Sequence, residues 1–217
     1  MKNKTKDLTE GSIGKLILMF ALPLLGSSLI QQMYSTVDLI FVGRFIGKEA
    51  SAAVGSSDLL VTCIVGLFTG ISVGSGVVAA QAFGQKNNKT LHKVIQTAFF
   101  FGLIGALVLM IGGIILAPTF LHWLDTPAEV FDMAVLYLRI YFAGIFGIVE
   151  YNLCSGIVRS LGDAKSALKF QIFGGVANIV CDYLFIVVFH MGIAGAALAT
   201  IGAQIVSAIL TIHYLCK

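Results

Sequence analysis

Long stretches of the sequence carry no formal charge. Residues 16–37, 59–85 and 94–124 contain no Asp, Glu, Lys or Arg, and residues 170–216 contain only Asp182. A helix needs about 20 apolar residues to cross a bilayer, whereas strands cross only as closed barrels of short alternating segments. As a single helix the last stretch would measure about 70 Å at 1.5 Å per residue, so we expect two spans there. These runs predict an all-α, polytopic membrane protein.

The composition excludes several other classes of protein. Hydrophobic residues make up 58% and charged residues 12% of the chain, whereas soluble domains carry about 45–50% apolar and about 25% charged residues. Too little polar surface remains to cover a soluble globule, which excludes a cytosolic enzyme and a nucleic-acid-binding domain. The four cysteines have no CxxC spacing and lie in apolar segments, so we interpret them as small apolar residues.

Helix boundary signals divide the apolar runs into six predicted transmembrane helices. Gly192 divides the last run in two, since glycine readily ends helices. Thr126, Pro127 and Glu129 form a helix-start signature before a further, less apolar segment. After a predicted cytoplasmic segment at residues 1–12, a single six-helix transmembrane lobe is expected over 13–217. Its helices are expected at about 13–43, 51–84, 90–117, 128–159, 165–189 and 193–215.

The basic residues predict the orientation of these helices. Eleven of the 14 lie on one side of the predicted membrane, and loops rich in Lys and Arg stay in the cytoplasm. Both termini are therefore predicted to be cytoplasmic in a multi-pass protein of the cell membrane. The eleven residues are Lys2, Lys4, Lys6, Lys15, Lys86, Lys89, Lys93, Arg159, Lys165, Lys169 and Lys217.

A polar stripe on the first predicted helix ends in a carboxylate. Gln31, Tyr34 and Ser35 precede Asp38 by seven, four and three residues and share its helix face. An ionisable side chain inside a span costs at least about 2.5–3.5 kcal/mol on insertion scales, so function is the default explanation. Gln31, Tyr34 and Ser35 are candidates for the lining of a substrate cavity.

A second polar group lies on the last two predicted helices. Asp182 follows Asn178 by one turn, and Gln204, a further cavity candidate, follows Thr200 by the same spacing. Asn152 is a separate amide within the fourth predicted helix. The structural alternative for each of these residues is a hydrogen bond between helices, which is common in membrane proteins.

Together these side chains predict a cation-binding site. Carboxylates, amides and a hydroxyl are hard oxygen donors, which suit Na⁺ or a proton better than Zn²⁺ or copper. Two carboxylates close together in a dry pocket also favour binding of a proton. Either chemistry loads and unloads a cation within the membrane, which is the basis of ion-coupled transport.

Other residues in the spans predict bending and packing. Pro23 lies inside the first predicted helix, where it removes one backbone hydrogen bond and allows a bend. Gly66, Gly70 and Gly74 form a double small-xxx-small pattern, which is typical of close helix packing.

Two opposite charges lie on the fourth predicted helix without being able to pair. Arg139 and Glu150 are three turns apart. Arg139 is placed in the outer half, from which a long side chain can reach the headgroups. Glu150 is deeper and has no obvious partner in its segment, so the sequence leaves its role open.

Several separated motifs resemble one transporter family. The first predicted helix, with Ala21-Leu22-Pro23 and the segment YSTVDLIFVG from Tyr34 to Gly43, resembles that of multidrug and toxic compound extrusion (MATE) transporters. Further resemblances follow in the same order: VGSGVVAAQAFGQ (73–85), SGIVRSLGDAKSAL (155–168), NIVCD (178–182) and GIAGAALAT (192–200).

The resemblance implies a cation-driven antiporter that exports organic, often cationic, compounds by alternating access. It implies a Na⁺ or proton site formed by Asp38, Asp182, Asn178 and Thr200, with Asn152 nearby, and bending of the first helix at Pro23. No organic cofactor is implied, and the coupling ion is Na⁺ or H⁺. Glu150 does not belong to the family pattern.

Family members have about twelve helices, so the resemblance covers an N-terminal lobe. We expect either a piece of a longer chain, whose C-terminal six-helix lobe completes it, or a half-size unit that pairs with a second subunit. A lipid-linked oligosaccharide flippase of the same superfamily is the nearest alternative, but it would need more cationic residues in its cavity. A non-transporting membrane scaffold is a further alternative, in which Asp182 would have no purpose. An enzyme is not expected, since neither a nucleophile–base pair nor a His-rich motif is present.

Overall fold

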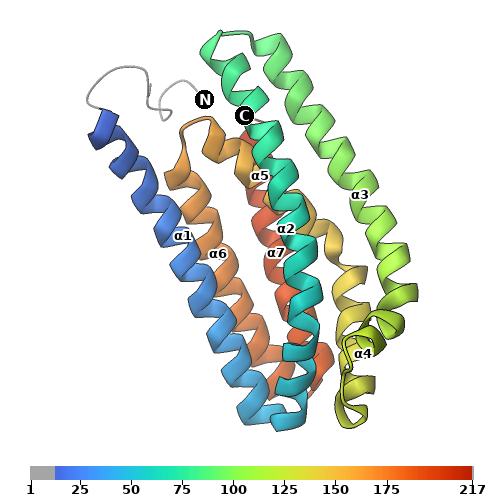
Figure 1. The fold of residues 1–217 in the computed structure, drawn as a ribbon. Coiled ribbons are helices and arrows are strands. Elements are labelled where there is room, and N and C mark those ends of the chain that lie inside the picture. Colours follow the sequence, from blue (N-terminus) through green and yellow to red (C-terminus); the bar gives the residue numbers. More distant parts are fainter. Residues whose placement is uncertain (1–12, 217) are drawn as a thin grey trace.

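The chain folds into an up-and-down bundle of helices (Figure 1). The computed structural model describes residues 13–216, so the predicted segment 1–12 and Lys217 lie outside the described residues. Within that range the chain contains no strand, and the predicted all-α fold is confirmed. The elements are α1 (Ile13–Phe41), η1 (Val42–Ile46), α2 (Lys48–Gly84), α3 (Asn88–Trp123), α4 (Ala128–Ala143), α5 (Ile145–Ser160), α6 (Ala164–Asp182), η2 (Tyr183–Val188) and α7 (Ile193–Leu215), where η1 and η2 are short π-helices.

Most of the helices have the length and composition of membrane spans. In the described part of the chain, residues 48–84, 88–123, 164–188 and 193–215 are each long and apolar enough to cross a bilayer, and α4 with α5 forms a fifth, broken candidate. The remaining helix, α1, has 29 residues. At 1.5 Å per residue it measures about 44 Å, more than the roughly 30 Å of a hydrocarbon core.

The fourth predicted helix is broken, which differs from the expectation of one continuous helix over 128–159. α4 ends at Ala143, α5 begins at Ile145, and the two are bent by 54°. Gly144 lies against α7, where an added Cβ atom would overlap the side chain of Ile201. The bend therefore occurs at a point where the chain packs closely against α7, a constraint that hydrophobic patterning does not show.

The third helix is longer than predicted at both ends. The Asn87 side chain accepts a hydrogen bond from the Thr90 N–H at 3.1 Å and caps the helix start. At the other end α3 continues past Pro118 to Trp123, although the prediction stopped before the proline. Proline deprives the helix of a single N–H donor, and neighbouring helices make this tolerable in membrane proteins.

The core of the bundle is formed around α5. This helix packs against α2, α3 and α7, and most of its residues are buried. By contrast, Ile104, Val108 and Ile115 of α3 are 63%, 64% and 67% exposed. A continuous exposed apolar face of this kind suits contact with hydrocarbon rather than water.

On the other side of the bundle, α1 packs against α6, and α6 packs against α7 (Figure 1). The two helices with predicted cation-binding carboxylates, α1 and α6, are thus direct neighbours. Their arrangement positions the candidate site.

The glycines that mediate helix packing are not the ones that the small-xxx-small pattern indicated. A Cβ atom added at Gly66, Gly70 or Gly74 would meet nothing within 4 Å in the described residues. Close packing instead occurs at glycines such as Gly113, where an added Cβ would overlap the ring of Phe142, and Gly147, where it would lie 3.0 Å from the backbone nitrogen of Ile205. The prediction of packing at the α2 stripe is therefore wrong for this lobe.

Adjacent glycines of α3 allow a matched test of this packing. Gly113→Ala should destabilise the fold by about 1–3 kcal/mol, because the new methyl group would overlap the buried Phe142 ring. Gly112→Ala should be neutral or slightly stabilising, because its Cβ would meet nothing within 4 Å. Thermal unfolding of the purified full-length protein measures both, and equal Tm values for the two variants would contradict the packing described here.

Candidate functional site

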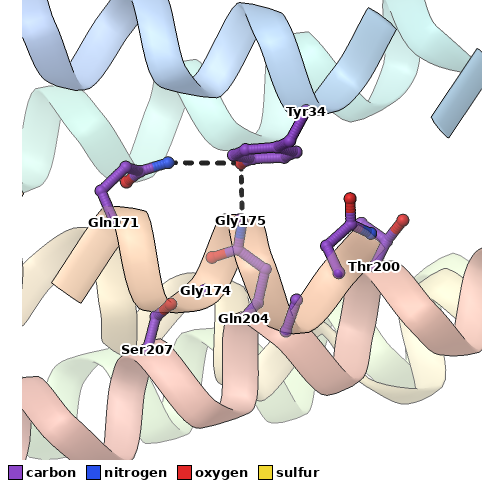
Figure 2. Close-up of a pocket in the computed structure, with 9 residues that line it drawn as sticks. Tyr34, Gln171, Gly174, Gly175, Thr200, Gln204 and Ser207 are labelled. Carbon is purple, nitrogen blue, oxygen red and sulfur yellow. Dashed lines mark hydrogen bonds between the residues drawn. The ribbon is translucent and has the colours of Figure 1, made fainter. Parts of the chain in front are cut away.

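A small polar cavity lies between α1, α6 and α7 (Figure 2). Its free space is about 10 Å³, on the order of what one water molecule or small ion needs. Tyr34 projects from α1 over Gly175 of α6, with Gln204 and Thr200 of α7 beside it (Figure 2). The lining residues are Tyr34, Gln171, Gly174, Gly175, Asn178, Thr200, Ala203, Gln204 and Ser207.

Tyr34 links the three helices through its hydroxyl oxygen. The amide groups of Gln171 and Gln204 both donate to that oxygen, each at 3.4 Å (Figure 2). The Tyr151 hydroxyl of α5 donates in turn to the side-chain oxygen of Gln171. Gly175 makes room for the tyrosine ring, since an added Cβ would lie 3.1 Å from it. The sequence indicated Tyr34 and Gln204 but missed Gln171, which lies two turns before Asn178 on the same helix.

Two carboxylates lie next to this cavity. Asp182 is fully buried at the last position of α6, Asp38 of α1 is 8% exposed, and the two interact electrostatically. Asn178, one turn before Asp182, is 1% exposed and lines the cavity. The predicted association of Asp38, Asp182 and Asn178 therefore corresponds to one local group in the structure.

Most polar atoms of this group have no hydrogen-bond partner. When both carboxylates are ionised, neither oxygen of Asp182 receives a hydrogen bond, and neither side-chain polar atom of Asn178 has a partner. Oδ1 of Asp38 and Oε1 of Gln204 are unpartnered as well. Buried polar groups are nearly always hydrogen-bonded, so such a concentration of orphaned atoms requires an explanation.

The composition of these atoms indicates what would satisfy them. Five of the orphaned atoms are oxygens that accept, and the Asn178 nitrogen is the only donor among them. The Thr200 hydroxyl donates to the Ala196 carbonyl at 3.1 Å, which leaves its lone pairs available. The donor set fits a small hard cation or a proton, since both complement carboxylate, amide and hydroxyl oxygens.

Two tyrosines of α4 stand near the carboxylates, and the sequence did not indicate them. Tyr137 and Tyr141 are buried and stacked, with ring centroids 6.2 Å apart. Tyr137 is near enough to Asp38 and Asp182 to interact with both electrostatically. The spacing of four residues in a segment with few other polar groups was the available signal, but aromatic residues at that spacing are common in helix cores.

The remaining predicted residues lie elsewhere. Gln31 and Ser35 are exposed on α1 and do not line the cavity. The Asn152 side-chain nitrogen donates to the Ile148 carbonyl at 2.8 Å. The Thr69 hydroxyl of α2 donates to the Asn152 side-chain oxygen at 3.5 Å. These contacts place Asn152 at the α2–α5 interface rather than among the cavity-lining residues. α1 runs continuously past Pro23, and Arg139 is exposed.

Comparisons with known proteins agree with this architecture. The family model described as MatE matches residues 23–184. Probable multidrug resistance protein YpnP of Bacillus subtilis (strain 168) is 32% identical over 99% of the chain and 48% of its own length. The crystal structures of MATE in the straight and bent conformations superpose with TM-scores of 0.89 and 0.87 at 28% identity, covering 99% and 94% of the chain.

The chain therefore belongs to the MatE family of multidrug and toxic compound extrusion proteins. It spans about half the length of the relatives it matches, 48% of YpnP and 48% and 46% of the chains in the two crystal structures. The helical bundle thus corresponds to one lobe of a MATE-type fold.

The hydrogen bonds of Tyr34 can be tested with a second tyrosine as control. Tyr34→Phe removes the acceptor of the Gln171 and Gln204 amides, and a buried polar group left unpaired costs about 1–3 kcal/mol. Tyr183→Phe changes an exposed tyrosine of η2 and should leave the stability unchanged. Thermal unfolding of the full-length protein compares the two, and an unchanged Tm for Tyr34→Phe would show that the tyrosine does not tie α1 to α6 and α7.

Proposed function

We propose that this chain forms the N-terminal lobe of a multidrug efflux antiporter that is driven by a Na⁺ or proton gradient. Its substrates would be small organic, often cationic, compounds. The single observation that carries the proposal is the buried group of Asp38, Asp182 and Asn178, whose unpartnered oxygens lie beside a cavity of ion size. The family membership and the name of the YpnP relative support the substrate class.

The proposed coupling ion would bind between α1 and α6. Asp38, Asp182, Asn178 and Thr200 would hold Na⁺, or the two carboxylates would share a proton. An added positive charge would satisfy the orphaned oxygens and remove the repulsion between two buried carboxylates. Binding would therefore draw α1 towards α6, while release would loosen the contact.

α1 is suited to such a movement. Among the long helices it packs mainly against α6, so it can shift without disrupting the core around α5. Pro23 supplies a point at which its backbone hydrogen bonding is interrupted. Two of the similar crystal structures are of MATE in a straight and in a bent conformation. We propose that ion binding shifts α1 of this chain between two such shapes, which would alternate access to the substrate cavity.

The remainder of the transporter would be a second six-helix lobe, on the same polypeptide or on a second subunit. Gln31 and Ser35 are exposed beside Tyr34 on α1 and are proposed to line the substrate cavity shared with that lobe. Both termini are proposed to be cytoplasmic. α1 begins and α7 ends at the end of the bundle where the α2–α3 and α5–α6 turns carry the basic residues (Figure 1).

Neutral substitutions of the two carboxylates test the proposed coupling. Asp38→Asn and Asp182→Asn in the full-length protein should reduce gradient-driven export of a cationic dye to the level of protein-free vesicles. The reason is that an amide can neither carry a proton nor balance a cation. Asp132→Asn changes an exposed aspartate of α4 and should transport as the unchanged protein does. Undiminished export by both site variants would refute the site.

Thermal unfolding with different ions distinguishes the two proposed coupling ions. If Na⁺ binds, a concentration about 100 times Kd should stabilise the fold by about 2.7 kcal/mol, and Asp182→Asn should abolish the effect. Choline chloride at equal ionic strength is the control. Stabilisation by low pH without any response to Na⁺ would identify the proton instead, and a response to neither ion would contradict both forms of the proposal.

A further inference from the structure

A further carboxyl group with an unpartnered oxygen lies away from the Asp38–Asp182 site. Glu150 of α5 is fully buried, and its Oε1 atom has no hydrogen-bond partner. Its other oxygen has one weak contact, from the Cys154 Sγ at 4.0 Å. The residue is not used by the proposed transport mechanism, and nothing in the family resemblance assigns it a role.

The carboxyl group is enclosed by a close crossing of α3 and α5. Gly102 of α3 is buried, and a Cβ atom added there would lie 2.6 Å from Oε1 of Glu150. The carboxyl group therefore lies against the backbone of α3. Residues 94–124, which include this part of α3, contain no Asp, Glu, Lys or Arg. The crossing thus offers no counter-charge, and the backbone of α3 lies directly against the carboxyl oxygen.

The surrounding helices supply no charge to balance an ionised Glu150. α5 packs mainly against α2, α3 and α7. The first turn of α2 lies at the far end of that helix and is left aside. The remaining titratable residues of α2, α3 and α7 are Asp58, Cys63, Lys89, His92, Lys93, His122, His213 and Tyr214. Among the titratable groups of residues 13–216, only Cys154 interacts with the Glu150 carboxyl. An isolated ionised carboxylate in such surroundings is strongly unfavourable, and a buried acid without a partner neutralises by taking up a proton.

We propose that Glu150 is a second proton-binding site of this lobe, which holds one proton while α3 and α5 are in contact at Gly102. Release of the proton breaks the O–H bond and transfers the proton to water. It therefore requires that the two helices separate enough to admit water. The site would report the state of the α3–α5 crossing independently of the ion bound between α1 and α6.

Infrared spectroscopy of the full-length protein tests the proposal directly. A neutral carboxylic acid has a carbonyl stretching band that an ionised carboxylate lacks. The measurement is made at neutral pH on the Asp38→Asn/Asp182→Asn variant, which removes the two carboxyl groups of the proposed coupling site. Adding Glu150→Gln should remove one neutral-acid band. Adding Glu129→Gln, at an exposed acid in the first turn of α4, should remove none.

Loss of an ionised-carboxylate band on Glu150→Gln, in place of a neutral-acid band, would overturn the proposal. Glu150→Leu is a second variant, because a neutral residue is expected to be tolerated at this position. If the Gln and Leu variants both fail to accumulate as folded protein while Glu129→Gln does, the position requires a charge, and the proposal is wrong. The infrared measurement does not depend on transport. A negative infrared result therefore leaves the proposed coupling at Asp38 and Asp182 standing, and a failed transport test leaves the proposed proton site at Glu150 standing.

Discussion

A polar group buried among apolar helices must find its partner within the protein, and this constraint governs both the fold and the candidate site. The helices satisfy their own backbone groups. Some buried side-chain hydroxyls are satisfied within their own helix, as Ser57 is by donating to the Ala53 carbonyl at 2.9 Å, and others across helices, as Ser207 is by donating to the Phe170 carbonyl at 3.3 Å. Against this background the orphaned atoms of Asp182 and Asn178 stand out. They lie one turn apart on α6, and Asn178 lines a cavity that α1 and α7 also line, which is the arrangement of a site and not of scattered packing defects.

The bundle separates a rigid part from a part that is free to move. α5 is held on several sides, and glycines such as Gly147 bring it so close to α7 that no side chain fits between them. α1 has one principal neighbour among the long helices, α6, and is tied to the rest through Tyr34. The proposed cation site lies between α6, which also packs against α7, and the edge helix α1. A change in charge at such a site can change the position of α1. This property makes the location of Asp38 and Asp182 more informative than their identity alone.

Much of the site could be predicted because an acid within an apolar run is conspicuous. Asp38, Asp182 and Asn178 were recognised in this way. Gln171 and Tyr137 were not, since a glutamine near a helix start and a tyrosine in an aromatic-rich helix are ordinary in sequence. Asn152 is likewise an amide within an apolar predicted helix, yet its hydrogen bonds join it to Ile148 and Thr69 at another interface. Which face of a helix meets which neighbour is decided by packing that a single sequence does not display.

The sequence by itself determined that this chain forms membrane helices, about how many there are, and which acids are costly enough to require a function. These conclusions depend on the free energy of placing each residue in hydrocarbon, which is a property of the residue and its immediate run. Only the tertiary structure decided that α1 and α6 are neighbours, that the chain bends at Gly144, and that the glycines of α2 pack against nothing in this lobe. Those features depend on contacts between residues far apart in the chain, such as Gly144 with Ile201, and therefore on how whole helix surfaces fit together.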